Sequence, residues 1–469
     1  MSGNFLTEAI LRYLNHTPTT DQSVLLDKIL DFLSLPDQEL FLLKGYAGTG
    51  KTSLVSALVK GLGEIGYRVV LLAPTGRAAK VFSHYAGTKS FTIHKKIYRQ
   101  RSASGGVTFQ LTENLHKDTL FIVDEASMIG NSGQGEELFG SGRLLDDLIE
   151  YVYTGERCRL ILMGDTAQLP PVMQPLSPAL DVNELRGYGL AIEEYTLRQV
   201  VRQDSDSGIL FNATALRTAL DVGETTLFPK ISTEGFADVQ TVDGTDFVDL
   251  LSSAYSQSGV ENAIVVSRSN KRSNGYNQGI RSRILYREEE ICPGDLLIVA
   301  KNNYFWSEGL NDLDFIANGE IVEVLRVRKQ YELYGLRFAD MLVCLRDYDV
   351  EMEVKILLDG LASETASISK ETSNQLFTSV WEDYPEARSK RARMEKLKKD
   401  PHFNALIVKY AYAVTCHKAQ GGQWEHVFVD IGYVTQEFLG DDFYCWLYTA
   451  VTRAAKHLYF VNLPKQMLA

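Results

Sequence analysis

The stretch that decides the fold reads Leu40-Phe41-Leu42-Leu43-Lys44-Gly45-Tyr46-Ala47-Gly48-Thr49-Gly50-Lys51-Thr52. Its apolar run predicts a buried strand, its glycines predict a tight turn, and Lys51-Thr52 opens a segment with a helical pattern. Gly45, Gly50, Lys51 and Thr52 fill the G-x-x-x-x-G-K-[ST] pattern of a nucleoside-triphosphate loop. The glycines let the backbone wrap a phosphate with its N–H groups pointing inward, and the following helix presents its positive end. We therefore predict a nucleotide site at residues 45–52.

Two side chains of this loop have chemical tasks of their own. Lys51 can reach the outer phosphates, and the Thr52 hydroxyl can hold Mg²⁺. The alternative is a chance glycine-rich turn, which average glycine usage would produce on the order of once per hundred chains of this length. The strand–loop–helix context favours the nucleotide site, but it does not say what the nucleotide is used for.

Composition bounds the class of protein. The chain has 469 residues, 45% hydrophobic and 23% charged, which suits roughly three globular domains. No apolar stretch approaches the ~20 residues of a membrane span, and the first residues lack a signal-peptide pattern, so we expect a cytoplasmic protein with no membrane association. The five cysteines are far apart and form no C-x-x-C pair, which indicates reduced thiols.

The charge balance limits how nucleic acid could be bound. Lysines and arginines number 48 and acidic residues 60, so the net charge is −12. Proteins that coat nucleic acid usually carry a basic surface, and this balance counts against that mode. It leaves open a protein that holds nucleic acid in a local groove.

Apolar runs alternate with helical patterns along the first half. Strands are expected at 68–73, 120–123 and 160–163, each followed by polar or glycine residues, and residues 1–37 are expected to be helical. This alternation predicts a parallel sheet with helices on both faces, which binds ligands at the carboxyl ends of its strands. Runs at 263–266, 426–429 and 458–461 predict a second α/β domain.

Three segments depart from this pattern. Residues 319–358 read as short strands with turns, which predicts a small barrel inserted in the second α/β domain. The basic segment 388–399 is either a solvated helix face, the reading we favour, or an arm that faces nucleic acid. Residues 102–113 predict a short hairpin that stands off the first domain.

The strand ends carry the other parts of an NTPase site. After one apolar run, Asp124 can hold the Mg²⁺ shell, and Glu125 can orient or deprotonate the attacking water. After the next, Gln168 is a candidate sensor of the γ-phosphate and the water. Phosphoryl transfer needs more positive charge than Lys51 supplies. Arg202 and Arg453 could supply it, although for each arginine taken alone we favour an ordinary surface or ion-pair role.

The order of these segments resembles the superfamily 1 helicases of the 5′→3′ branch, and among them the RecD and Dda helicases. Residues 45–52 resemble motif I, 73–79 motif Ia, 92–94 motif Ib, 124–127 motif II, 164–172 motif III, 201–203 motif IV, 414–421 motif V and 448–453 motif VI. Gln22 fits the glutamine that reads adenine upstream of motif I. The resemblance covers nearly the whole chain. Cys416 inside motif V and the high acidity are departures from the family pattern.

The resemblance implies an α/β fold of two RecA-like P-loop domains with ATP in the cleft between them. It places domain 1A at residues 1–190 with a 1B pin insert at about 97–118, and domain 2A at 191–318 and 408–469. The SH3-like 2B barrel with its basic helical arm then occupies 319–407. Arg202 and Arg453 become arginine fingers that reach across the cleft. Movement follows because ATP closes the cleft and hydrolysis opens it again.

The resemblance also assigns residues to ligands. The expected nucleotide contacts are Gln22, Gly45, Ala47, Gly48, Thr49, Gly50, Lys51 and Thr52, with Thr52 and Asp124 on Mg²⁺. The expected catalytic residues are Lys51, Glu125, Gln168, Arg202 and Arg453. The expected DNA contacts are Thr75, Arg77, His94, Thr415, His417, Lys418 and Gln420, with Phe109 of the pin stacked on the last base pair. Without the motifs, His94 and His417 would be read as structural histidines.

The leading hypothesis is an ATP-dependent 5′→3′ DNA helicase that uses Mg²⁺ and acts as a monomer on single-stranded DNA and on junctions with duplex. The first alternative is a DNA-stimulated ATPase that translocates or displaces proteins without efficient unwinding. The second is a regulatory module that binds nucleotide and DNA without turnover, which the intact set of Lys51, Asp124, Glu125 and Gln168 argues against. Repair, recombination and replication are all compatible with such a motor, and the pattern names no protein partner.

Overall fold

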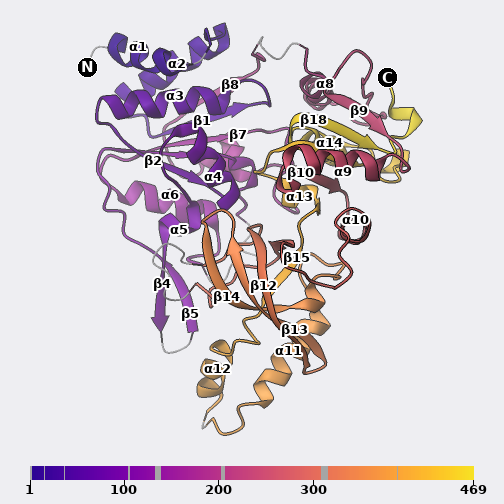
Figure 1. Ribbon diagram of the computed structural model, residues 1–469. Coiled ribbons are helices and arrows are strands. Elements are labelled where there is room, and N and C mark those ends of the chain that lie inside the picture. The colour runs from indigo at the N-terminus through magenta and orange to yellow at the C-terminus, as the bar shows by residue number, and fades with distance from the viewer. Residues whose placement is uncertain are drawn as a thin grey trace.

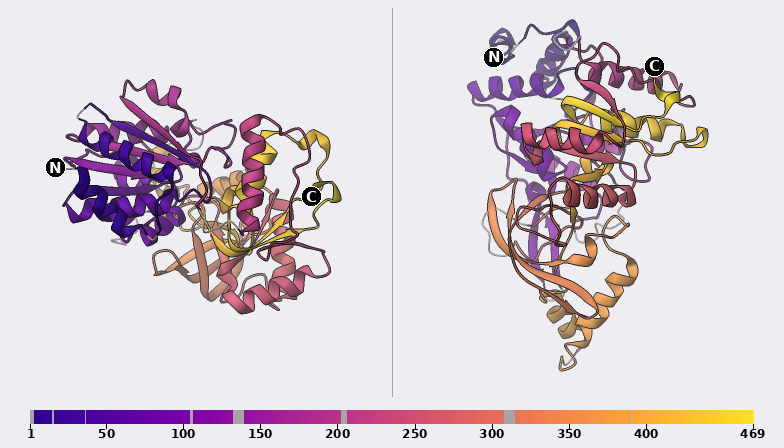
Figure 2. Two further views of the ribbon diagram at one scale, coloured as in Figure 1. Left: turned by 90° about the horizontal axis from the view of Figure 1, so that it is seen from above. Right: turned by 45° about the vertical axis from the view of Figure 1, so that its right-hand side comes forward.

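The computed structural model describes residues 3–14, 16–35, 37–103, 106–131, 139–201, 206–307, 315–387 and 389–469. Two α/β domains lie side by side, and a barrel lies below them with a pair of helices at its far end (Figures 1 and 2). No helix in these ranges is long and apolar enough to cross a membrane.

The first domain is built on a six-stranded parallel sheet in the order β3-β2-β6-β7-β1-β8. Its strands are β1 (Leu40–Gly45), β2 (Arg68–Ala73), β3 (Ser90–Thr92), β6 (Thr119–Val123), β7 (Arg159–Gly164) and β8 (Ile192–Leu197). Its helices are α1 (Gly3–Tyr13), α2 (Thr20–Ser34), α3 (Lys51–Glu64), α4 (Gly76–Ala86), α5 (Ile93–Ile97), α6 (Leu144–Thr154) and α7 (Val182–Arg186). The predicted alternation of strands and helices is confirmed.

Strand β8 corrects the predicted end of the first domain. It pairs in parallel with β1, so the first sheet extends to residue 197 and not only to 190. The sequence concealed this strand because it carries Glu193 and Glu194, which lie at the sheet edge and pair with Lys28 and Lys44. An edge strand keeps one side in contact with water, and charged residues are therefore tolerated there.

The second domain has a five-stranded parallel sheet in the order β16-β10-β17-β18-β9. Its strands are β9 (Val239–Val242), β10 (Ala263–Ser267), β16 (Ala413–Thr415), β17 (Trp424–Asp430) and β18 (Ala454–Val461). Its helices are α8 (Gly208–Val222), α9 (Phe247–Ser258), α10 (Asn270–Arg283), α13 (Cys416–Ala419) and α14 (Asp441–Val451). The second α/β domain predicted from the three apolar runs is confirmed.

A closed barrel of five strands interrupts the second domain. Its strands are β11 (Leu296–Val299), β12 (Ile321–Leu333), β13 (Leu336–Leu345), β14 (Val350–Leu357) and β15 (Leu406–Tyr410), and α11 (Lys370–Glu382) and α12 (Lys390–Lys398) follow β14. The barrel is confirmed, but the predicted bounds 319–407 are too narrow, since β11 and the end of β15 lie outside them. Both strands are short apolar runs that periodicity alone could not assign to a barrel.

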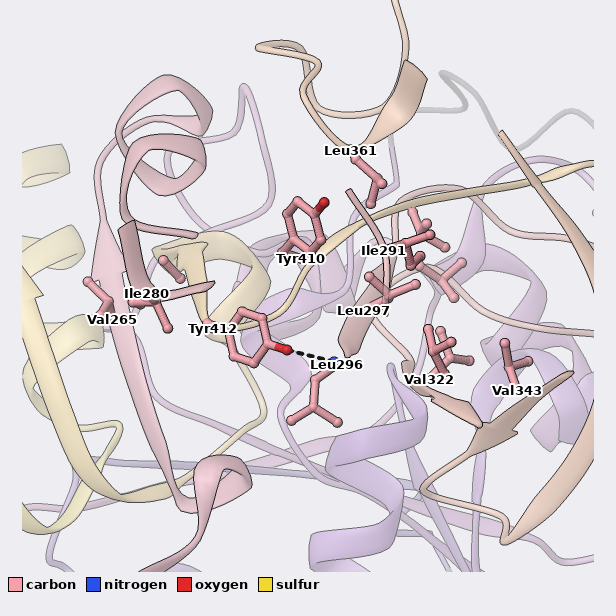
Figure 3. Packing of buried hydrophobic residues seen from close by; sticks show 14 of the residues in the cluster. Val265, Ile280, Ile291, Leu296, Leu297, Val322, Val343, Leu361, Tyr410 and Tyr412 are labelled. Atoms are coloured by element: carbon pink, nitrogen blue, oxygen red, sulfur yellow. Dashed lines mark hydrogen bonds between the residues drawn. The ribbon is translucent and has the colours of Figure 1, made fainter. Parts of the chain in front are cut away.

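The barrel and the second domain share one hydrophobic core. Val265 and Ile280 of the domain pack in the same cluster as Leu297, Val322 and other residues of the barrel (Figure 3). The Tyr412 hydroxyl accepts a hydrogen bond from the Leu296 backbone N–H at 3.1 Å within this cluster. The shared core ties the barrel to the domain that it interrupts.

Two smaller features extend from these units. Strands β4 (Tyr98–Ala103) and β5 (Gly106–Leu111) form the predicted antiparallel hairpin. In the helical arm, the Arg393 guanidinium lies 4.7 Å from the Trp381 ring centroid, and Lys396 pairs with Glu386. Two of the basic side chains in residues 388–399 therefore contact other residues of the arm.

Candidate functional site

The P-loop connects β1 to α3 with a backbone that requires glycine. Gly48 and Gly50 have φ angles of +75° and +78°, a region that residues with a side chain rarely adopt. Helix α3 begins after Gly50 without a side-chain cap, so its first N–H groups remain available to an anion. Lys51 folds back and donates hydrogen bonds to the carbonyl oxygens of Gly45 and, at 2.9 Å, Tyr46. The loop thus has the geometry of a phosphate cradle.

Gln22 contacts the P-loop from helix α2. Its side chain is fully buried and donates a hydrogen bond to the Thr49 carbonyl at 3.0 Å. Its oxygen accepts from the Thr19 N–H, which completes a capping box at the start of α2. A Cβ at Gly50 would come within 2.5 Å of the Gln22 amide nitrogen. The predicted adenine reader therefore also fixes the conformation of the loop.

Asp124 and Glu125 leave the end of β6 beside the P-loop. Burial, and then the charge of Glu125, raise the pKa of Asp124, whose carboxylate accepts a hydrogen bond from the Glu125 N–H at 2.8 Å. Such a carboxylate is stabilised by a nearby cation. Carboxylate and hydroxyl oxygens are the ligands that Mg²⁺ prefers, so Asp124 and Thr52 fit this ion.

The turn after β7 holds the predicted water sensor. Asp165 is almost fully buried, and burial raises the pKa of its carboxyl group. Gln168 donates its backbone N–H to the Asp165 carbonyl at 3.3 Å, which closes the turn. The Gln168 side-chain oxygen is buried and has no hydrogen-bond partner within the described ranges. An acceptor left in this state fits a site that a water or a ligand donor completes.

Arg453 of the second domain reaches the carboxylates of the first. Its guanidinium lies 4.0 Å from the Glu125 carboxylate, and its side chain is only 4% exposed. Hydrogen bonds to the carbonyls of Gly422 at 3.2 Å and Thr449 at 3.0 Å hold it in place. Arg202, the other predicted finger, lies outside the described residues.

Helix α14 makes further contacts across the domain interface that the sequence did not predict. The Tyr448 hydroxyl accepts a hydrogen bond from the Ala47 N–H at 2.8 Å and donates one to Asp165 at 2.6 Å. The Thr449 hydroxyl accepts from the Leu169 N–H at 2.8 Å. These partners lie about 280 to 400 residues apart in sequence, and no local pattern could have paired them.

Helix α8 approaches the P-loop from the same side. The Arg217 guanidinium lies 4.4 Å from the Tyr46 ring centroid, and the Tyr46 hydroxyl donates to Asp221 at 2.8 Å. The Val201 N–H donates to the Gly48 carbonyl at 3.0 Å. The second domain therefore contacts the P-loop itself as well as the carboxylates beside it.

Several predicted DNA contacts gather at a second place on the domain interface. The Arg77 guanidinium lies 3.8 Å from the Trp424 ring centroid, and burial lowers the pKa of Arg77 to about 10. Thr75 caps α4 by accepting a hydrogen bond from the Ala78 N–H. Lys418 has a buried ammonium group with no hydrogen-bond partner among the described residues, and burial lowers its pKa to about 8. Arg77, Lys418 and Trp424 line a cavity of about 840 Å³ between the two domains and the barrel.

The remaining residues of motif V differ in accessibility. His417 is exposed and Thr415 is partly exposed. Gln420 is mostly buried, and its amide donates to the Leu169 carbonyl at 2.7 Å. The predicted DNA contact Gln420 thus binds the turn that carries Gln168.

Phe109 and His94 lie in an aromatic cluster. Phe109 is 4% exposed, and its ring stacks on the Phe139 ring with 4.7 Å between the ring centroids. The centroid of the Tyr304 ring lies 4.8 Å from that of Phe109. The structure contradicts the expectation that Phe109 stacks on a base pair, because its apolar ring anchors the hairpin instead. The His94 ring lies 4.8 Å from Phe139, and burial lowers the pKa of His94 to about 4. His94 is therefore a neutral ring within this cluster.

Comparison with known proteins gives this geometry a family context. A family model described as an AAA domain matches residues 22–226, and one described as a UvrD-like helicase C-terminal domain matches residues 410–461. Both descriptions agree with the predicted resemblance to the superfamily 1 helicases. The first match includes the P-loop, and the second includes Lys418 and Arg453.

Individual relatives are distant. An uncharacterized protein R530 of Acanthamoeba polyphaga mimivirus is 23% identical over 94% of this chain and 99% of its own length. The ATP-dependent DNA helicase dda of Enterobacteria phage T4 is 22% identical over 89% of this chain and 93% of its own length. The ATP-dependent RecD2 DNA helicase of Deinococcus radiodurans is 32% identical over 38% of this chain and 21% of its own length.

A solved structure of Bacteroides Pif1 bound to ssDNA aligns over 97% of this chain and 95% of its own. The alignment has 16% sequence identity and a TM-score of 0.47.

Proposed function

We propose that this chain is an ATP-dependent DNA helicase that translocates 5′→3′ on single-stranded DNA and unwinds duplex at junctions. The observation that carries the proposal is the approach of Arg453 from the second domain to Glu125 beside the P-loop of the first, at 4.0 Å. This contact makes the site composite, and a composite site can couple hydrolysis to domain movement.

The residues divide the work of hydrolysis between the domains. Gly45, Ala47, Gly48, Thr49 and Gly50 wrap the phosphates, and Lys51 turns from its carbonyl partners to them. Bound Mg²⁺, held by Thr52 and Asp124, would neutralise charge on the phosphate oxygens. Glu125 acts as the base for the attacking water, and Gln168 orients that water with its side-chain oxygen, to which no described residue donates a hydrogen bond.

Arg453 completes the site when the cleft is closed. Its guanidinium stabilises the negative charge that develops on the transferred phosphoryl group. Arg202 has the same role in this proposal. Loss of the phosphate after hydrolysis removes the bridge between the domains, and the cleft relaxes.

The DNA path follows the second cluster of the interface. Thr75, Arg77, Lys418 and the exposed His417 offer cations and polar groups that suit a sugar–phosphate backbone without sequence readout. Arg77 comes from the first domain and Lys418 from the second, so a closing cleft changes the spacing of two phosphate contacts. That change in spacing would move the strand. Action as a monomer is part of the proposal.

One observation favours the alternative of a translocating ATPase without efficient unwinding. Phe109 is buried in the aromatic cluster, so it is not available to stack on the last base pair. Under this alternative the motor moves along single-stranded DNA and displaces bound proteins, while the hairpin serves as a support.

A strand-displacement assay with defined tails decides between these functions. Duplexes with a 5′ tail, a 3′ tail or blunt ends are incubated with ATP and Mg²⁺, and streptavidin displacement from biotinylated single strands is measured in parallel. We expect unwinding only with the 5′ tail. Unwinding only from the 3′ tail would refute the direction, and streptavidin displacement without unwinding would establish the alternative.

A further inference from the structure

The Tyr448 hydroxyl joins three parts of the molecule. It lies on α14 of the second domain and is bonded to the P-loop at Ala47 and to the turn after β7 at Asp165. We propose that Tyr448 is a positioning residue for ATP hydrolysis, which holds Gln168 in place only while the two domains are in contact. This inference rests on the proposed function, because it concerns how the same site is switched on.

The turn of residues 165–169 is held at both ends from the second domain. Tyr448 binds the side chain of Asp165 at one end. At the other end, the Leu169 N–H donates to Thr449 and the Leu169 carbonyl accepts from Gln420. Gln168 lies between these two anchors, and its side-chain oxygen has no hydrogen-bond partner in the described part of the chain. The position of that oxygen is therefore set from across the cleft.

The chemistry of the Tyr448 hydroxyl suits this task. Tyr448 is 1% exposed, and burial together with the nearby Asp165 charge raises its pKa well above the ordinary value. The hydroxyl therefore stays protonated, so it can accept from the Ala47 N–H and donate to Asp165 at once. A phenylalanine would fill the same space and lose both bonds, leaving a buried N–H and a buried carboxylate without this partner.

The consequence concerns the timing of hydrolysis. If the second domain separates, the hydrogen bonds of Tyr448, Thr449 and Gln420 are lost together and the turn is released. Gln168 then no longer presents its oxygen at a fixed place. A misplacement of about 1 Å at a reacting centre can cost on the order of 10²-fold in rate. Separation would thus withdraw both Arg453 and the water-orienting group.

Tyr444 provides a matched control on the same helix. It lies one turn before Tyr448, is 3% exposed, and donates its hydroxyl to the Leu227 carbonyl at 2.9 Å. This bond stays within the second domain. Tyr444→Phe therefore removes a buried hydroxyl from α14 without touching the cleft, and it reports the purely structural cost of such a loss.

The experiment measures ATPase turnover with saturating single-stranded DNA for the full-length chain and for Tyr448→Phe, Tyr444→Phe, Gln168→Ala and the double variant Tyr448→Phe/Gln168→Ala. We expect Tyr448→Phe to lower kcat by about 10-fold to 100-fold, with ADP affinity within about twofold of wild type. Tyr444→Phe should retain kcat within about twofold. In the Gln168→Ala background, Tyr448→Phe should cause no further loss, since residues that act as a unit are not additive.

Two results would overturn the inference. One is a kcat for Tyr448→Phe equal to that of Tyr444→Phe. The other is a double variant whose losses multiply, which would mean that Tyr448 does not act through Gln168. A wild-type chain without DNA-stimulated turnover refutes the proposed function instead, so the two failures are distinguishable.

Discussion

The two α/β domains share a parallel construction, but a strand-to-helix turn in each domain begins its helix in a different way. In the first, β1 leads into α3 through a glycine turn, and α3 begins without a side-chain cap. In the second, β10 leads into α10 through Ser269, whose hydroxyl caps the helix by accepting from the Arg272 N–H. One helix start is open to an anion, and the other is already satisfied by its own sequence.

Neither domain forms the proposed site alone. The first domain supplies backbone N–H groups and the carboxylates of Asp124, Glu125 and Asp165. The second supplies side-chain donors from α14 and its end, chiefly Tyr448 and Arg453. The Arg453 guanidinium lies 4.0 Å from the Glu125 carboxylate, so opposite charges of the two domains attract each other at this place. Nucleotide phosphates would strengthen this attraction by adding negative charge.

The largest effect is expected where the first domain loses its cation. Lys51→Ala should abolish detectable ATP turnover, because no other lysine extends from the loop to the outer phosphates. Lys44→Ala is the matched control: Lys44 lies on the preceding strand and pairs with Glu194 at the sheet edge. A steady-state ATPase assay with single-stranded DNA measures both. ATP turnover retained in Lys51→Ala would contradict the proposed role of the P-loop in hydrolysis.

A smaller loss is expected from the second domain. Arg453→Ala should lower kcat by about 10³-fold, the usual contribution of an arginine finger, while ADP binding stays close to wild type. Lys456→Ala on the following strand, whose partner Glu425 lies at the surface, should have little effect. Single-turnover kinetics and ADP titration separate the two quantities. An unchanged kcat would mean that the second domain contributes no charge to catalysis.

The sequence predicted the first domain's part of the site better than the second domain's part. A P-loop is contiguous, so a strand, a glycine turn and a helix can be read within 13 residues. Tyr448 has no such signature, because its partners Ala47 and Asp165 lie hundreds of residues away. Its role depends on how two domains meet, and hydrophobic periodicity carries no information on that. Strand β8 was missed for a related reason, since its charged residues match partners on other elements.

The hairpin insert of the first domain contributes to the packing of the protein. Phe109 was predicted to meet DNA, but the structure surrounds it with Phe139 and Tyr304. Phe109→Ala should therefore destabilise the chain by about 3 kcal/mol, the usual cost of emptying an aromatic core position. Phe211→Ala, at a ring that is 52% exposed, should cost less than about 1 kcal/mol. Denaturant unfolding compares the two, and equal stability of both variants would contradict the cluster as an anchor.

The smallest effect is expected at the cations that we propose to bind DNA, and it depends on pH. Burial lowers the pKa of Lys418 to about 8, whereas a bound phosphate favours the charged ammonium. The affinity for single-stranded DNA should therefore fall as the pH rises from 7 to 9 at constant ionic strength, by up to about tenfold as this lysine loses its proton.

Substitution separates Lys418 from the other groups that titrate in this range. Lys418→Gln should weaken binding at pH 7 and flatten the pH dependence, while Lys399→Gln on the exposed part of the helical arm should leave both unchanged. Burial also lowers the pKa of Lys409 to about 8, and this lysine remains in both variants. A pH dependence of the DNA affinity that persists in Lys418→Gln therefore measures the contribution of Lys409. Fluorescence anisotropy of a labelled oligonucleotide gives the affinities. A pH dependence that survives Lys418→Gln and changes with Lys399→Gln would move the DNA path from the domain interface to the arm.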